Sequence, residues 1–225
     1  MKDLFIYRYL SKDVKALFDR GEVIPETIGR SGNFVYSLGG EYYIKCSRDS
    51  LALENERERE IWLEGRLIAP KVVDFHTFSH EGESWAYLVT TAVKGDRASD
   101  STYLADPERL IDTLAEAMAA VHALDTATCP FLAECGEKEG KGLLPDFFQT
   151  VCHGDFCLPN IIVTKKGFQG FVDVGDLGVS DPWLDYAWCL WSLSYNLKTE
   201  GYRDTMLEKL GIKFDEEKYR LFVGE

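Results

Sequence analysis

His153-Gly154-Asp155-Phe156-Cys157-Leu158-Pro159-Asn160 is the stretch of this sequence that carries the most chemistry. It lies between a short apolar segment ending at Cys152 and the apolar run Ile161-Ile162-Val163, which predicts a loop between two buried segments. The carboxylate of Asp155 can orient a hydroxyl group or accept its proton, and the amide oxygen of Asn160 can bind a cation without adding charge. Because a surface turn with a capping aspartate has similar residue types, the loop needs support from elsewhere in the chain.

A second carboxylate supplies this support. Phe171-Val172-Asp173-Val174-Gly175 places an aspartate at a strand end, eighteen residues after Asp155 and directly after a hairpin turn at residues 167–170. A tight turn would explain this aspartate if it stood alone. Mg²⁺, however, takes a few protein oxygens together with the phosphates of a nucleotide, so Asn160 and Asp173 together predict a Mg²⁺ site. The two segments resemble the catalytic and metal-binding loops of kinases.

The chain changes in composition near residues 94–96, which predicts two lobes. Alternating residues and turn signals predict a mostly antiparallel sheet with one helix in the first part, with strands within 22–46, 71–78 and 85–93 and the helix at 50–67. Helical periodicity dominates afterwards, at 107–124, 182–197, 202–210 and 214–222. We therefore predict an α+β fold with a small β-rich lobe at 1–94 and a mostly helical lobe at 95–225. The resemblance of the two loops to those of kinases implies a bilobal, protein-kinase-like fold, in which the first lobe binds the nucleotide and the second supplies the catalytic and acceptor contacts. A nucleotide is expected at their junction, because ligand sites favour such joins.

The first lobe contains a candidate phosphate-binding lysine. Lys45 ends the alternating strand Tyr42-Tyr43-Ile44-Lys45, and a glutamate from the following helix would hold its flexible side chain. The residues alone leave four candidates for this partner, which are Glu54, Glu56, Glu58 and Glu60. Gly29-Arg30-Ser31-Gly32-Asn33 could cover the phosphates, although a plain hairpin fits it equally well.

Composition and charge exclude several classes of protein. The 225 residues are 45% hydrophobic and 28% charged, which excludes disorder and collagen-like repeats. No apolar run reaches the roughly 20 residues of a membrane helix, and the N-terminal residues lack a secretory h-region, so we expect a cytoplasmic protein. The net charge of −13 disfavours nucleic acid and anionic membranes as partners and would favour a cationic partner or substrate, although a soluble acidic surface explains the charge better.

The chain resembles the aminoglycoside phosphotransferase family, and most closely its 3′-phosphotransferase branch. The matching segments extend over nearly the whole chain and include 27–29, 61–72, 115–125, 128–131, 153–161, 170–175 and 181–187. His153-Gly-Asp together with Leu158-Pro-Asn-Ile161 is highly specific to these kinases. The resemblance implies that ATP or GTP, with Mg²⁺, donates its γ-phosphate to a hydroxyl of a small molecule, foremost an aminoglycoside antibiotic.

The resemblance also implies a role for individual residues. Asp155 would be the catalytic carboxylate, and Asn160 and Asp173 would bind the metal. The nucleotide would contact Lys45, the Glu56 partner of that lysine, the ring of Tyr43, the backbones of Thr91 and Val93, and the Ser31 loop. Asp185 would brace the catalytic loop, whereas His153 and His122 would be structural.

The acceptor side departs from the family. Asp176 follows Gly175 where the family has arginine, Tyr195 and Asn196 stand where it has an acidic pair, and only residues 132–152 separate Phe131 from the catalytic loop. Glu134, Glu137 and Glu139 could supply acceptor contacts from this segment, although a solvated loop fits better. Two alternatives therefore stay open. The chain could phosphorylate another amine-bearing or sugar-like alcohol, or it could be a nucleotide-binding relic without catalysis.

Overall fold

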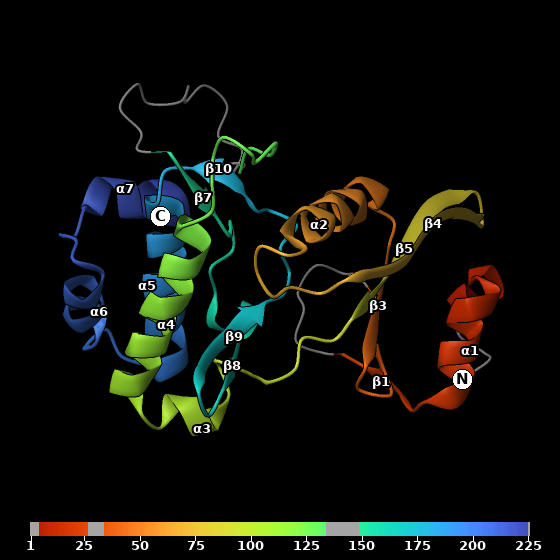
Figure 1. Cartoon of the computed structure of the whole chain (residues 1–225), viewed down its shortest axis with the longest axis horizontal. Helices are drawn as coiled ribbons and strands as arrows, with labels where there is room; N and C mark the ends of the chain where they lie inside the picture. The colour runs from red at the N-terminus through yellow and green to blue at the C-terminus, as the bar shows by residue number, and fades with distance from the viewer. Residues whose placement is uncertain (1–4, 27–33, 134–148, 225) are drawn as a thin grey trace. The chain divides into compact units, whose positions relative to one another are not determined.

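The computed structural model describes residues 5–26, 34–133 and 149–224 (Figure 1). Its elements are η1 (Phe5–Tyr9), α1 (Lys12–Arg20), β1 (Val23–Pro25), β2 (Phe34–Leu38), β3 (Tyr42–Ser47), α2 (Ser50–Leu63), β4 (Val72–His80), β5 (Glu83–Thr91), β6 (Asp96–Arg97), α3 (Ser101–Leu104), α4 (Pro107–His122), β7 (Thr150–Cys152), η2 (Leu158–Asn160), β8 (Ile161–Thr164), β9 (Gly167–Phe171), β10 (Gly178–Ser180), α5 (Trp183–Leu197), α6 (Arg203–Leu210) and α7 (Glu216–Val223). The predicted α+β architecture, an antiparallel sheet followed by a mostly helical part, is confirmed. The chain divides into two compact units, residues 1–64 with 70–92 and residues 65–69 with 93–225.

The first unit is built on a five-stranded antiparallel sheet in the order β1-β2-β3-β5-β4. The glycines at 39 and 40, with φ of 59° and 68°, turn the chain between β2 and β3, so the hairpin expected there is present. The central pair places Lys45 opposite Leu88 and Tyr43 opposite Thr90. Because side chains alternate along a strand, Tyr43, Lys45 and Leu88 share one face of the sheet.

The two faces of this sheet pack against different helices. Ala86 and Leu88 pack against Leu53 of α2 on the face that carries Lys45. The opposite face packs against η1 and α1, in a core that contains Ile6, Leu10, Val14, Phe18, Leu38, Ile44, Cys46, Trp85, Tyr87 and Val89. The sequence predicted a single helix in this part of the chain, and α1 is an addition to it. The helix begins at Lys12, after the N-cap Ser11, whose hydroxyl accepts the Val14 N–H. Its apolar residues Val14, Leu17 and Phe18 have the spacing of one helical face, a signal that the sequence analysis missed.

The second unit combines five helices with two small sheets, β6-β8-β9 and β10-β7, among its described residues. Asp106 caps α4 by accepting the Arg109 N–H, and Pro107 occupies the first turn. The buried stripe of α4 contains Leu110, Ile111, Leu114, Ala117, Met118 and Val121. No helix in the described part of the chain has the length and apolar composition needed to cross a bilayer.

Candidate active site

The loop between β7 and β8 brings Asp155 and Asn160 into direct contact. The Asn160 amide nitrogen donates to Asp155 Oδ2 at 2.8 Å and to the Asp155 backbone carbonyl at 3.1 Å. The 3₁₀ turn η2 produces this contact because it returns the chain by one short turn, with Asn160 N–H donating to the Cys157 carbonyl. Since Asn160 uses its nitrogen in this way, its Oδ1 is the atom that can coordinate a cation.

His153 supports the loop through both ring nitrogens. Its Nδ1 accepts the Asp155 N–H at 3.3 Å, so the proton of the neutral ring lies on Nε2, which donates to the Val172 carbonyl at 3.1 Å. The ring is fully buried and packs against Phe171, with centroids 5.1 Å apart. With both nitrogens occupied, His153 positions the loop and has no nitrogen left for proton transfer to a substrate.

Asp173 follows the strand that packs against this loop. The neighbouring Val172 N–H donates to the Asn160 carbonyl at 2.9 Å, which ties the end of β9 to the loop. Asp173 itself is exposed and has a φ of 55°, a left-handed conformation that is uncommon outside glycine. Asp173, the second candidate metal ligand, therefore directly follows Val172, whose backbone is hydrogen-bonded to Asn160, the first candidate ligand.

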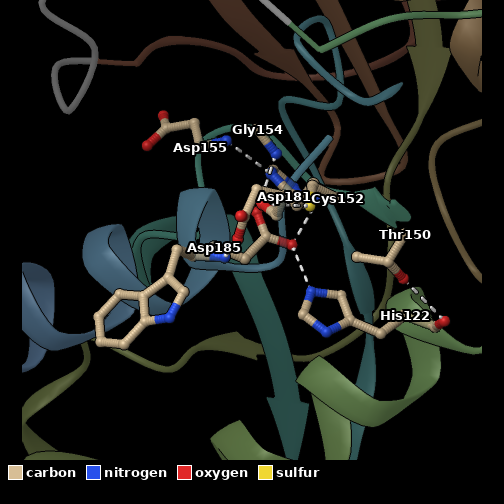
Figure 2. Close-up of polar contacts among 9 residues, drawn as sticks. His122, Thr150, Cys152, Gly154, Asp155, Asp181 and Asp185 are labelled. Atoms are coloured by element: carbon tan, nitrogen blue, oxygen red, sulfur yellow. Dashed lines mark hydrogen bonds and ion pairs between the residues drawn. The ribbon is translucent and has the colours of Figure 1, made fainter. Parts of the chain in front are cut away.

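Asp185, fully buried near the start of α5, holds the beginning of the loop (Figure 2). Its Oδ2 accepts the His153 N–H at 2.8 Å and its Oδ1 accepts the Gly154 N–H at 3.0 Å. His122, in the last turn of α4, donates from Nε2 to the same Oδ2 at 3.1 Å. Charge-assisted hydrogen bonds of this kind are about twice as strong as neutral ones, so this carboxylate fixes the backbone that carries Asp155.

One residue that the sequence analysis missed also positions the loop. Ser192 is buried in α5, and its Oγ accepts the Leu158 N–H at 3.0 Å and an Asn196 amide hydrogen at 3.3 Å. Ser192 lies seven positions after Asp185, which is the spacing of two helical turns on one face. That spacing is the only signal in the sequence that points to it.

The thiol of Cys157, within the loop, has low reactivity. Burial, followed by the neighbouring carboxylate of Asp155, raises the pKa of Cys157 well above its ordinary value. Since the thiolate is the reactive form of cysteine, Cys157 is a poor nucleophile at neutral pH.

Asp176 packs directly against the loop. Gly154 has a φ of 90°, and a Cβ at this position would lie 2.7 Å from both the carbonyl carbon and the Cβ of Asp176. Only glycine allows this approach. The backbone of Asp176 therefore contacts Gly154, the residue before Asp155, while the carboxylate of Asp176 is exposed.

In the first unit, Lys45 Nζ lies 2.6 Å from Glu56 Oε1. Glu56 is buried on the face of α2 that contains Leu53, whereas Glu54 and Glu58 are exposed. Glu60 is also buried, but Glu56 is the residue bonded to the lysine. Tyr43 is half-buried on the same sheet face as Lys45.

The remaining candidate nucleotide contacts are Thr91, Val93 and Ser31, and they lie in different parts of the chain. The Thr91 N–H donates to the Lys71 carbonyl at 2.9 Å, so this N–H is already engaged within the first unit. Val93 belongs to the second unit and is half-buried. Ser31 and the residues Glu134, Glu137 and Glu139 lie outside the described residues.

Comparison with known proteins gives a consistent result. The phosphotransferase enzyme family matches residues 29–135 and 138–222. An aminoglycoside 3′-phosphotransferase of Enterococcus faecalis is 28% identical over 95% of this chain and 96% of its own. A streptomycin 3″-kinase of Streptomyces griseus is 28% identical over 90% of this chain and 94% of its own. A solved aminoglycoside phosphotransferase from Streptomyces rimosus has a TM-score of 0.76 at 25% identity, covering 99% of this chain and 97% of that one. Its complex with ADP and streptomycin has also been solved.

Proposed function

We infer the reaction from one premise, which is that the chain belongs to the phosphotransferase enzyme family. We propose that it transfers the γ-phosphate of ATP or GTP to a hydroxyl group of a small cationic molecule. Residues 1–94 would bind the nucleotide, and residues 95–225 would supply the catalytic and acceptor contacts. The observation that carries the proposal is the hydrogen bond between Asn160 and Asp155 in a loop held by Asp185.

Asp155 would orient the attacking hydroxyl. Its Oδ2 is occupied by Asn160, so its Oδ1 is the oxygen that would accept the hydrogen bond from the acceptor. Phosphoryl transfer requires little covalent chemistry from the protein, and alignment of the acceptor with the phosphate supplies much of the rate. The three backbone and side-chain anchors of the loop, Asp185, His153 and Ser192, would therefore contribute to kcat by keeping Asp155 in place.

The donor set suits Mg²⁺. Asn160 Oδ1 and the Asp173 carboxylate are hard oxygen ligands, and Mg²⁺ binds through one or two such groups plus phosphate oxygens. The orientation of Asn160, with its nitrogen turned to Asp155, directs its oxygen away from that carboxylate. When bound, Mg²⁺ would neutralise phosphate charge.

Lys45 would contact the nucleotide phosphates as a positioned charge. Glu56 holds its ammonium at 2.6 Å, which restricts a side chain that would otherwise lose more entropy on binding. Tyr43 would stack on the base, with the backbones of Thr91 and Val93 as candidate hydrogen-bonding groups, and the loop containing Ser31 would cover the phosphates.

An aminoglycoside is the first candidate acceptor, because the Enterococcus faecalis and Streptomyces griseus relatives are named for such substrates. The net charge of −13 favours approach of a polycation. One observation favours a second candidate, an alcohol with fewer positive charges. Tyr195 is one of the two positions where the resemblance implies acidic residues. Lys198 Nζ lies over its ring, 4.1 Å from the ring centroid, and this ammonium would repel a polycation there.

A ligand screen combined with product detection tests the proposal. We expect ATP or GTP with Mg²⁺ to raise the Tm, and an aminoglycoside to raise it further and to become phosphorylated. Stabilisation by nucleotide with phosphorylation only of a monoamine or neutral sugar alcohol would establish the second candidate. Nucleotide binding without transfer to any member of a broad alcohol panel would support a non-catalytic relic and refute the proposal.

A further inference from the structure

Three side chains with different donor atoms meet beside the catalytic loop. A ring nitrogen of His122, Cys152 Sγ and an Asp185 carboxylate oxygen all lie within 4.8 Å of one another. They come from α4, β7 and α5, and Figure 2 shows them converging. Cys152 and Asp185 are fully buried, whereas the His122 side chain is 15% exposed and gives the cluster a route to solvent.

We propose that this cluster binds a thiophilic divalent cation such as Zn²⁺ and that binding lowers the catalytic rate. Nitrogen, sulfur and carboxylate oxygen form a three-residue ligand set of the kind that zinc accepts, with a fourth position left for water. The sulfur ligand distinguishes the cluster from the oxygen-only set at Asn160 and Asp173, because thiolates select soft cations over Mg²⁺.

The existing hydrogen bond marks where the cation would sit. His122 Nε2 and Asp185 Oδ2 are 3.1 Å apart, close to the roughly 3.3 Å expected between two ligands bound tetrahedrally at about 2.0–2.1 Å. The cation would replace the proton now shared between these atoms. Asp185 would remain oriented by the His153 and Gly154 amides, as metal-binding carboxylates commonly are by their own hydrogen bonds.

Binding also requires changes, and these set its cost. The Cys152 thiol now donates to the Asp181 carbonyl at 3.4 Å, and it must lose its proton to become a ligand. The donor atoms lie within 4.8 Å of one another, so matching the closer spacing of a tetrahedral site requires a contraction of at most about 1 Å. Affinity should therefore be moderate and should rise with pH as protons are released.

The contraction provides the link to catalysis. Asp185 accepts the N–H groups of His153 and Gly154, which precede Asp155 directly. Because the His122–Asp185 spacing already fits a bound cation, the contraction falls mainly on Cys152, which directly precedes His153. Movement of Cys152 toward the cation would shift the backbone that carries Asp155, and a misplacement of about 1 Å can cost about 100-fold in rate. The inhibition should appear in kcat more than in the KM for nucleotide.

The test is a titration of the full-length protein with Cd²⁺, whose sulfur-to-metal charge transfer absorbs in the ultraviolet. The wild type should show this band together with a rise in Tm. Cys152→Ser should lose the band and bind at least about 10-fold more weakly, and His122→Asn should weaken binding similarly. Cys129→Ser is the matched control, because Cys129 is a half-buried thiol of the same unit that is not in the cluster.

Catalysis gives a second measurement. At saturating Mg²⁺, Zn²⁺ should lower kcat in the wild type and in Cys129→Ser, and a zinc-selective chelator should restore it. The residual activity of Cys152→Ser, whatever its level, should resist the same Zn²⁺ concentration. An undiminished Cd²⁺ band in Cys152→Ser, or the absence of any band in the wild type, would overturn the proposal, and neither result depends on the identity of the acceptor.

Discussion

Asn160 donates an amide hydrogen to Asp155 Oδ2 at 2.8 Å, so the candidate metal ligand and the candidate catalytic carboxylate are parts of one hydrogen-bonded unit. The contact gives Asn160 two tasks, since its nitrogen orients Asp155 while its oxygen is available to a cation. Substitutions at either residue should therefore affect both the alignment of the acceptor and the dependence on Mg²⁺.

Asn160→Asp tests this dual role. The change replaces a donor with a second carboxylate beside Asp155, and two close carboxylates raise the pKa of one of them. We expect a lower kcat and an acidic limb of the pH–rate profile that moves to higher pH. Asn55→Asp adds the same charge on α2 and should leave the profile unchanged. An unaltered profile in Asn160→Asp would contradict the hydrogen-bonded unit.

Gly154→Ala tests the close approach of Asp176 to the catalytic loop. A Cβ at Gly154 would lie 2.7 Å from Asp176 atoms, so the loop must shift. We expect kcat to fall by about 100-fold, the effect of a misplacement of about 1 Å. Gly82→Ala is the control. Gly82 has a φ of 82°, close to the 90° of Gly154, so alanine causes similar backbone strain at both positions, but a Cβ at Gly82 would meet nothing within 4 Å. Equal kcat values for the two variants would argue against the steric explanation.

Asp185→Asn tests the anchoring of the loop. The amide has one acceptor oxygen, whereas Asp185 now accepts N–H groups on both oxygens. One buried donor would lose its partner, at a cost of about 1–3 kcal/mol in the free energy of unfolding. Denaturant unfolding should show this loss, together with a reduced kcat. A variant of unchanged stability and rate would show that these bonds do not hold the loop.

Glu56→Gln tests the pair that orients Lys45. Removing the charge weakens the bond that orients the ammonium, so we expect the KM for nucleotide to rise by about 10-fold, or about 1.4 kcal/mol. Glu58→Gln is the control, since Glu58 is exposed on the same helix. Steady-state kinetics with varied nucleotide distinguishes the two, and equal KM values would contradict the assigned role.

Buried thiols should make the fold sensitive to alkaline pH. Burial raises the pKa of Cys46 from 9.0 to about 12. The unfolded thiol ionises first as the pH increases, so the stabilisation is complete below about pH 9 and is lost between about pH 9 and 12. Cys46→Ala should show a shallower decline of unfolding free energy with pH, even though it lowers stability at neutral pH. Parallel pH profiles would contradict the raised pKa.

The sequence was most informative where chemistry is local. Asp155 and Asn160 are five residues apart, and a single turn is enough to join them, so their contact was predictable from the loop motif. The alternation of the strand containing Tyr43 and Lys45 predicted the face that those side chains share. For Lys45, the residues alone left four glutamates open, and the family resemblance selected Glu56.

Contacts between distant segments were harder to predict. His122 is 63 residues from Asp185, and Lys218, whose Nζ lies 2.7 Å from Asp181 Oδ2, is 37 residues from its partner. No periodicity specifies such pairs, because they depend on how helices pack. The short strands β6 and β10, of two and three residues, also gave no pattern, since alternation needs about four residues to register.

The most direct test of the account is phosphoryl transfer by Asp155→Asn, measured as phosphorylated acceptor, with nucleotide affinity measured in parallel. The substitution keeps the size of the side chain and removes the carboxylate that would orient the hydroxyl. We predict a loss of kcat of at least about 100-fold with nucleotide binding retained. Transfer at the wild-type rate by Asp155→Asn would contradict the central assignment.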